Sequence, residues 1–311
     1  MFTLVTDIVS APISIDYEPT TTSLVFSYNY DYGQPNNFAL LDTNVAVTPW
    51  SGISNLMDEI QITTVKRSVN GFRLGDMYYG TGNPGQIGWR SADGMAWNTN
   101  WATLTNEPDI LRGGLYVDQT GVFGYDLLAV TSDPTETLGQ RDVWRIDSQG
   151  NSSRITSISG YILEAVITLT NDVHKWGPWA GRLMTGDEEQ HLIYAVATNG
   201  VTTPFDLGIS PEVMLLIPTN QDLYVADYYS SEILKVSRTW FTNFVGDLLI
   251  VQSGEYLPGS PLPTPGPQLF IVSWDAITTN FVTLDIGFPN VSDNFEGATF
   301  APIDIPSQPL P

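Results

Sequence analysis

A short segment that begins with an acidic residue and continues as a strand of alternating apolar residues recurs along this chain. Copies begin at Glu59, Glu164, Glu212 and Glu296, and a fifth copy, LRGGLYVD, has Arg112 in the position of the Glu. The successive steps from residue 59 to 112, from 112 to 164 and from 164 to 212 are 53, 52 and 48 residues. Strand-type repeats with a period of about fifty residues are typical of a β-propeller, in which each repeat forms one blade.

Strand patterns also dominate the sequence between these copies. Runs such as SLVFSYN, DLLAVTS and HLIYAVA are rich in β-branched and aromatic residues and are bounded by Gly, Asn, Asp or Pro. No stretch keeps a helical apolar period over three turns, and only RTWFTNFVGD, at 238–247, predicts a short helix. The sequence therefore predicts an all-β fold.

The number of blades follows from counting first strands. Four strand patterns follow one another in 112–158 and again in 164–209, as expected for a blade of four antiparallel strands. The region 240–286 has three strand patterns without a first strand of its own. The C-terminal segment FEGATFAP is expected to close the ring beside N-terminal strands, because closure removes an open sheet edge. First strands near residues 12, 59, 112, 164, 212 and 296 favour a single propeller of six blades, with five or seven as alternatives.

The predicted propeller spans residues 1–303 and carries one Pro-rich insertion. The segment YLPGSPLPTPGP, at 256–267, favours an extended conformation and is predicted to project as a loop. Residues 304–311 form a Pro-rich C-terminal tail. Each of these two segments is either a docking arm or an ordinary solvated loop or frayed end.

The charge of the chain excludes several partners. The sequence has 34 Asp and Glu against 12 Lys and Arg, which gives a formal charge of −22. Nucleic acid is excluded as a partner because phosphate binding requires a basic face, and an anionic membrane surface is disfavoured for the same reason. The sequence contains no run of eighteen apolar residues, so no membrane insertion is predicted. The acidity fits either cation binding or a solubilising surface.

Residue types that are rare or absent limit the chemistry further. The chain has no Cys, which excludes disulfides, thiolate metal sites and Cys nucleophiles, and its two His exclude a three-His metal centre. The N-terminal segment MFTLVTDIVSAPIS lacks the basic region of a signal peptide. The chain is therefore expected to be made in the cytoplasm, with its place of action in a virion or another extracellular assembly.

The recurring acidic residues form the first candidate site. The first strand of each blade lines the central channel, so the side chains of Glu59, Glu164, Glu212 and Glu296 are expected to point toward one axis. Carboxylates without counter-charges raise one another's pKa, unless a cation or Arg112 lies among them. Ca²⁺, which takes six to eight oxygen ligands, is the predicted metal cofactor for these four Glu residues. In the alternative interpretation, each Glu accepts hydrogen bonds from neighbouring amides and the channel holds water.

Aromatic residues in predicted loops form the second candidate site. The chain has nine Trp, fourteen Tyr and thirteen Phe, and several fall beside Asn, Asp or Gly. Exposed aromatic rings suit the faces of sugars or a protein partner, whereas most aromatic residues of a propeller pack between blades. The predicted binding residues are Trp97, Trp101, Trp176, Trp179, Tyr228 and Tyr229.

Sequence motifs for common enzyme mechanisms are missing. The sequence has neither a Gly-x-Ser-x-Gly motif nor a Gly-rich phosphate loop after a strand. His174 and His191 are isolated, and isolated His residues are more often structural than catalytic. The acidic run Asp187–Glu189 is interpreted as a solvated turn, because it lacks the ligand spacing of a Ca²⁺ loop. No catalytic residue is predicted.

The run LRGGLYVDQTGVFGYDLLAVT, followed by VWRIDSQGN, LEAVITLTNDVHKWGPWAG and GDLLIVQ, resembles bacterial secreted β-propeller proteins related to the NHL and SMP-30 (lactonase-like) superfamily. In SMP-30-like enzymes a central Ca²⁺ is held by a Glu, Asn residues and an Asp, and an acidic residue acts as base. The resemblance implies that the four first-strand Glu residues occupy comparable positions. The Asn and Asp ligands of the family have no match in this sequence, and Arg112 would lie where the family has its cation.

Two functional hypotheses follow. In the first, the chain is a non-catalytic binding or structural module that presents aromatic loops to a glycan or a protein partner, in adhesion or as a component of a phage virion or similar assembly. In the second, it is a Ca²⁺-dependent hydrolase of the lactonase or esterase type whose site is the axial Glu residues. A third hypothesis is a solute-binding propeller that has lost its catalytic base.

Overall fold

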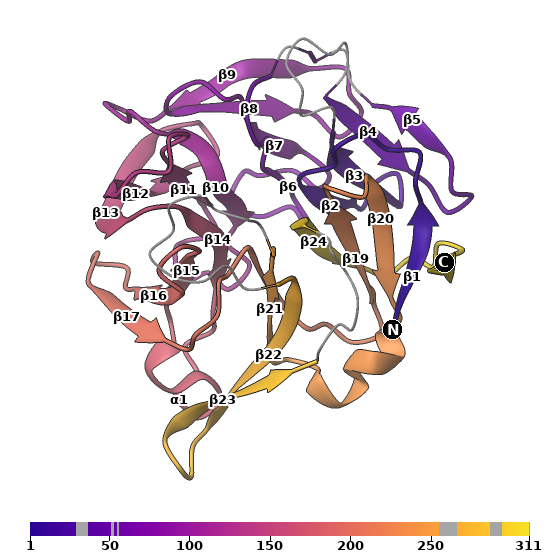
Figure 1. The fold of residues 1–311 in the computed structure, drawn as a ribbon. Helices are drawn as coiled ribbons and strands as arrows, with labels where there is room; N and C mark the ends of the chain where they lie inside the picture. Colours follow the sequence, from indigo (N-terminus) through magenta and orange to yellow (C-terminus); the bar gives the residue numbers. More distant parts are fainter. Residues whose placement is uncertain (29–36, 51–52, 55, 255–265, 287–293, 311) are drawn as a thin grey trace.

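The computed structural model describes residues 1–28, 37–50, 53–54, 56–254, 266–286 and 294–310. Within these residues the strands pair into six antiparallel sheets, which are arranged in a ring as the blades of one propeller (Figure 1). The predicted all-β fold and the predicted six blades are therefore confirmed. Most of the predicted Pro-rich insertion at 256–267 lies outside the described residues, so its structure stays a prediction.

The first four blades are each formed by one continuous stretch of chain, with the first strand innermost. They include both repeat units, 112–158 and 164–209, that the sequence predicts. Blade 1 contains β2 (Ile15–Glu18), β3 (Ser23–Ser27), β4 (Phe38–Leu41) and β5 (Val47–Pro49); blade 2 contains β6 (Ile62–Thr64), β7 (Met77–Gly80), β8 (Gln86–Arg90) and β9 (Trp97–Thr103); blade 3 contains β10 (Ile110–Val117), β11 (Leu127–Ser132), β12 (Gly139–Ile146) and β13 (Ser152–Gly160); and blade 4 contains β14 (Leu163–Thr168), β15 (Leu183–Asp187), β16 (Leu192–Val196) and β17 (Thr202–Asp206).

The last two blades are interlocked. After the innermost strand of blade 5 the chain crosses to blade 6, forms two strands there, and then returns to complete blade 5. It finally supplies the innermost strand of blade 6. Blade 5 contains β18 (Val213–Leu216), β21 (Leu248–Gln252), β22 (Gln268–Asp275) and β23 (Asn280–Asp285), and blade 6 contains β24 (Phe295–Ala301), β19 (Asp222–Asp227), β20 (Glu232–Val236), β1 (Phe2–Thr6) and β25 (Gln308–Pro309).

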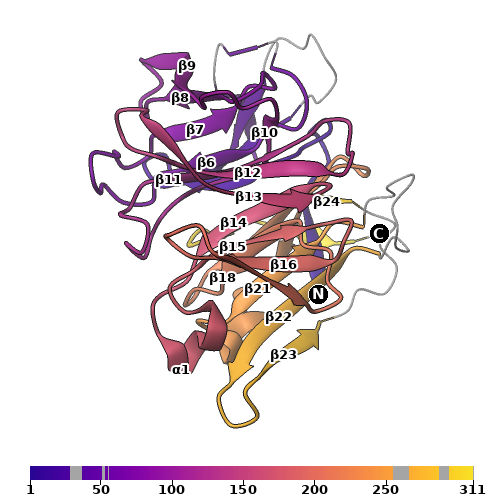
Figure 2. The same cartoon turned by 90° about the vertical axis from the view of Figure 1, so that its left-hand side faces the viewer.

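This arrangement explains the apparent lack of a first strand in the region 240–286, because β18 supplies it. The C-terminal strand β24 closes the ring, as predicted, but it pairs with β19 rather than directly with β1. β1 pairs with β20 on one side and with β25 on the other, so both ends of the chain lie in blade 6 (Figures 1 and 2). Lys235 on β20 also contacts the segment before β25, donating to the carbonyl oxygen of Ile305 at 2.9 Å.

Hydrophobic packing between neighbouring blades holds the ring together. Six buried apolar clusters are found among the described residues, and each joins one pair of adjacent blades, including blade 6 with blade 1. The helical elements lie outside the sheets, and none of those described is long and apolar enough to cross a lipid bilayer. They are α1 (Val173–Trp176), η1 (Gly177–Trp179) and η2 (Arg238–Phe244), the last within the segment predicted to be helical.

The inner strands approach one another closely near the axis. A Cβ atom on Gly113 would lie 2.0 Å from the carbonyl oxygen of Leu163 in the next blade, so only Gly fits there. The register shifts within β10 and again within β14, and Ala165 in β14 has a φ of 61°. Such bulges redirect side chains, and they occur here where the recurring acidic residues lie.

Candidate functional site

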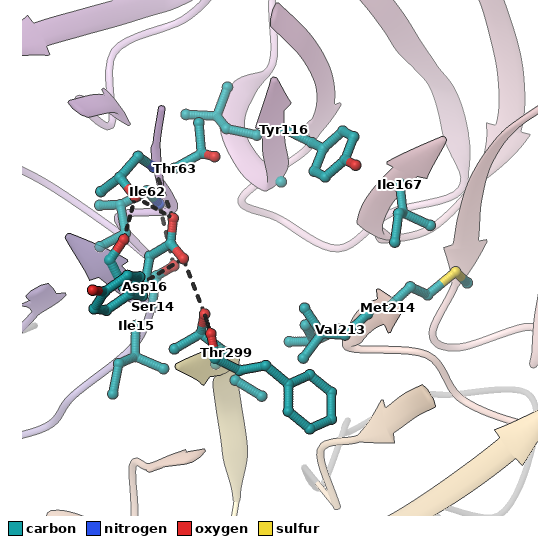
Figure 3. A pocket seen from close by; sticks show the side chains of 18 of the residues that line it. Ser14, Ile15, Asp16, Ile62, Thr63, Tyr116, Ile167, Val213, Met214 and Thr299 are labelled. Atoms are coloured by element: carbon teal, nitrogen blue, oxygen red, sulfur yellow. Dashed lines mark hydrogen bonds between the residues drawn. The ribbon is translucent and has the colours of Figure 1, made fainter. Parts of the chain in front are cut away.

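A cavity of about 620 Å³ lies on the propeller axis and is lined by the innermost strands of all six blades. Its wall is mainly apolar. Ile62 from blade 2, Ile167 from blade 4 and Val213 from blade 5 face it, and the ring of Tyr116 lies at its edge (Figure 3). The volume falls within the range of small-molecule sites in proteins.

A polar network occupies one part of the cavity wall. The Asp16 carboxylate accepts hydrogen bonds from the Thr64 amide at 2.7 Å, the Thr64 hydroxyl at 3.0 Å and the Thr299 hydroxyl at 3.0 Å (Figure 3). Lys66 Nζ lies 2.5 Å from the same carboxylate. Burial lowers the pKa of Lys66, and the charge of Asp16 opposes this shift. The network joins blades 1, 2 and 6, and its two charges are already paired with each other.

A group that we call the acidic ring lies where the innermost strands begin. Its members are buried, with exposed fractions of 2–8%. Glu212 itself lines the cavity. The charges of Glu59, Glu164 and Glu296 all raise the pKa of Glu212, as expected if the repeat positions converge. The acidic ring consists of Glu59, Arg112, Glu164, Glu188, Glu212 and Glu296.

Arg112 neutralises one carboxylate of the acidic ring. Its Nε and Nη2 atoms donate to the two carboxylate oxygens of Glu59 at 2.5 Å and 2.6 Å, and its Nη1 donates to Glu136 at 3.0 Å. Burial alone would lower the pKa of Arg112, but the charge and hydrogen bonds of Glu59 raise it well above its ordinary value. Arg112 therefore stays charged, and it is the partner that the sequence offered as an alternative to a bound cation.

Within the described part of the chain, Glu164 and Glu212 have no ion pair comparable to that of Glu59 with Arg112. Burial, followed by the charges of other ring members, raises the pKa of both side chains well above the ordinary value for Glu. Glu164 is only 2% exposed, and its Oε2 atom has no hydrogen-bond partner among the residues that the structure describes. A buried acceptor without a donor costs free energy, so this oxygen is a position where a ligand donor would stabilise the protein.

Glu188 joins the ring although it does not occupy a repeat position. The Ser253 hydroxyl donates to it, and burial raises its pKa to about 7. The interpretation of Asp187–Glu189 as a solvated turn was wrong, because all three residues are 4% exposed or less. The run is acidic and lies in a turn, so sequence alone could not distinguish burial from exposure.

The predicted Ca²⁺ ligands are the ring residues Glu59, Glu164, Glu212 and Glu296. Carboxylate oxygens are ligands that Ca²⁺ prefers, and the free oxygen of Glu164 is one such donor. However, in the described part of the chain no group of three or more acidic or His side chains is arranged to hold a metal ion, and Glu59 is occupied by Arg112. The described residues therefore do not form a complete Ca²⁺ site by themselves, and a metal at this position stays a prediction.

None of the six predicted aromatic residues lines the axial cavity, and they form three pairs that lie in different blades. Trp176 and Trp179 are 4% and 0% exposed, and Trp179 stacks on Phe281 with ring centroids 3.8 Å apart. These two rings are not available at the surface. Trp97 on β9 is 55% exposed, and its neighbour Trp101 packs on Tyr78. Tyr228 and Tyr229 contact each other in the turn after β19, and Tyr229 is 56% exposed.

No family model matches this sequence, and no curated protein is similar to it. Solved structures do share its fold. They include a streptogramin B lyase (TM-score 0.50, 12% identity, 97% of this chain and 91% of that chain), a virginiamycin B lyase from Staphylococcus aureus (0.52, 11%, 93% and 75%) and a gluconolactonase from Xanthomonas campestris (0.51, 11%, 87% and 85%). The chain therefore resembles lactonase-like β-propellers in its fold, and at these identities the likeness concerns the fold alone.

Proposed function

We propose that this propeller is a non-catalytic binding protein that holds a small organic molecule in its axial cavity. The observation that carries the proposal is the cavity itself, with a volume of about 620 Å³ and a wall built by all six blades. Most groups on the wall are apolar, and a few polar groups converge on it from Asp16 and Glu212. This combination is typical of ligand sites.

The wall is preformed because the innermost strands contribute apolar side chains to the interblade clusters. Leu115 on β10 and Ile167 on β14 contribute both to these clusters and to the cavity. A ligand would therefore enter without ordering the protein around it, which reduces the entropic cost of binding.

The neutral fluorescent probe N-phenyl-1-naphthylamine tests this proposal. We expect its fluorescence to rise on binding to the wild-type protein and to be lost in V213W, which fills the cavity with an indole ring. V201W introduces the same residue where Val201 is 59% exposed, outside the cavity, and should bind the probe as the wild type does. Absence of binding to the wild type, or equal binding to V213W, would contradict the proposal.

A Ca²⁺-dependent lactonase or esterase is the second candidate. The unpartnered Oε2 atom of Glu164 favours it, because this oxygen is free to meet a cation. Calorimetric titration of CaCl₂ into chelator-treated protein is the direct test. Binding that disappears in E164Q would support the metal site and justify a screen of lactones and esters, whereas no heat of binding would remove this candidate.

We also propose that a separate surface of this chain contacts a glycan or a protein partner, in a virion or another extracellular assembly. Its support is the exposure of Trp97 and Tyr229, two rings more than half open to solvent. Trp97→Ala should reduce binding on a glycan array or to an assembly partner without affecting the axial cavity. Unchanged binding in this variant and in Tyr229→Ala would count against an aromatic surface.

A further inference from the structure

The chemical class of the cavity ligand follows from the acidic ring. We infer that the ligand carries an organic cation, a primary ammonium or a guanidinium group, which is bound between Glu164 and Glu212 while the apolar body of the ligand lies against the cavity wall. This inference rests on the proposed binding function and specifies its ligand.

The ring already holds one cation of this chemistry. The guanidinium of Arg112 donates two hydrogen bonds to Glu59 and a third to Glu136. Arg112 stands at the repeat position that carries Glu in the neighbouring blades. A nitrogen cation with several N–H donors is therefore compatible with the spacing of these strands, and charge-assisted hydrogen bonds of this kind are strong.

The carboxylates beyond this pair offer acceptors for a second cation. Glu164 is 2% exposed, and its Oε2 atom accepts no hydrogen bond from the described residues. Glu212 lines the cavity directly. The charges of Glu164, Glu188 and Glu296 all raise the pKa of Glu212, so a positive charge added beside Glu212 would interact with several carboxylates. An ammonium has three donors and no acceptor, which matches sites that only accept.

The surroundings favour an organic cation over a metal ion. Ca²⁺ requires six to eight oxygen ligands, and no three acidic side chains of the described residues are grouped to share one. An organic amine needs fewer polar contacts, because the remainder of the molecule is apolar. Val213, immediately after Glu212, and Leu215 on the same strand line the cavity beside the ring and can contact that part.

Binding of a cation should be linked to the release of protons. The pKa of Glu164 and of Glu212 is raised in the free protein by burial and by the neighbouring carboxylates, so these groups bind protons at a higher pH than an ordinary Glu. A cation favours their ionised forms and expels those protons. The affinity should therefore increase as the pH rises, by about tenfold per pH unit for each proton released.

Calorimetry with hexylammonium chloride and 1-hexanol tests the inference, because the two molecules have the same apolar chain. We expect hexylammonium to bind at least about tenfold more tightly than the alcohol near pH 8. Its advantage should shrink as the pH is lowered, because hexylammonium stays charged and only the protein titrates. E212Q should abolish the preference, E164Q should weaken it, and E232Q, a matched change on β20 away from the cavity, should leave it intact.

The outcomes separate the inference from the proposal on which it rests. Equal binding of the amine and the alcohol would overturn the organic cation while leaving the cavity as a binding site. If neither molecule nor the fluorescent probe binds, both ideas fail. Tight binding of CaCl₂ that excludes hexylammonium would overturn the organic cation in favour of a metal. Two Gln variants are used so that one misfolded variant, recognised by circular dichroism, does not decide the result.

Discussion

Removal of the guanidinium from the acidic ring should destabilise the protein in a strongly pH-dependent manner. Arg112 is 5% exposed and makes a two-pronged ion pair with Glu59, which is 8% exposed. In R112M the apolar side chain keeps much of the volume of Arg112 but leaves Glu59 buried without its partner. Breaking a buried pair in this way typically costs about 3–5 kcal/mol.

The part of this cost that comes from the charge of Glu59 cannot exceed the free energy of protonating Glu59, because a neutral carboxyl no longer needs the guanidinium. An ordinary Glu has a pKa of about 4.3, and one pKa unit corresponds to about 1.4 kcal/mol. Protonation therefore costs about 3.7 kcal/mol at pH 7 and about 1 kcal/mol at pH 5. Burial already raises the pKa of Glu59 in the wild type, against the charge of Arg112, and R112M raises it further. The unfolded state of the variant then binds fewer protons than its folded state above about pH 4.3. The variant must therefore lose stability as the pH rises.

Urea denaturation of the wild type and R112M at pH 5, 6 and 7 measures this effect. We expect the difference in unfolding free energy to grow from about 1 kcal/mol to about 3–4 kcal/mol across this range. The double variant R112M/E59Q removes both charges and should regain most of the loss at pH 7. A difference that does not change with pH, or a double variant no more stable than R112M, would refute the reasoning.

Three further predictions concern other parts of the molecule. E164Q should raise the melting temperature more at pH 8 than at pH 5. The pKa of Glu164 is raised in the folded protein, so the wild type loses stability as the pH rises, and Gln removes this loss. An equal effect at both pH values would contradict this. L4A should cost about 2–5 kcal/mol in urea denaturation, since Leu4 on β1 packs in the cluster between blades 5 and 6, whereas I277A, at a position 94% exposed, should change stability by less than about 0.5 kcal/mol. W179A should cost about 3–5 kcal/mol and W97A little, and the reverse order would mean that the burial of these two rings is misassigned.

The period of the acidic residues was sufficient to predict the fold, but not the path of the chain through it. Five of the six innermost strands lie near a position that the period marks, whereas Glu296 at the start of β24 comes 84 residues after Glu212. The hairpin of β19 and β20 has the same alternating pattern as any other pair of strands, however, and a strand pattern does not specify its partner. Its placement in blade 6 depends on contacts with β24 and β1, which are distant in sequence.

The candidate site could be predicted only where it follows the repeat. Arg112 and the four first-strand Glu residues share one repeat position, so their convergence follows from the symmetry of the fold. Glu188 has no such marker, because it reaches the ring from the turn after β15. Trp176 and Trp179 were assigned to a loop from the neighbouring Gly and Pro, but that segment forms α1 and η1, which place both rings in the core.

The acidic ring is costly for a propeller that needs only to fold. Apolar side chains at these positions would avoid the desolvation of several carboxylates, and replacement of buried charges by well-packed apolar residues is often stabilising. The interblade clusters hold the blades together independently of these charges, and Arg112 neutralises only the carboxylates nearest to it. These buried carboxylates lack full counter-charges, are not required by the fold and lie beside a preformed cavity. The free form of the proposed cation-binding site should have these properties. The same charges that lower the stability of the free protein would then supply the affinity of the bound state.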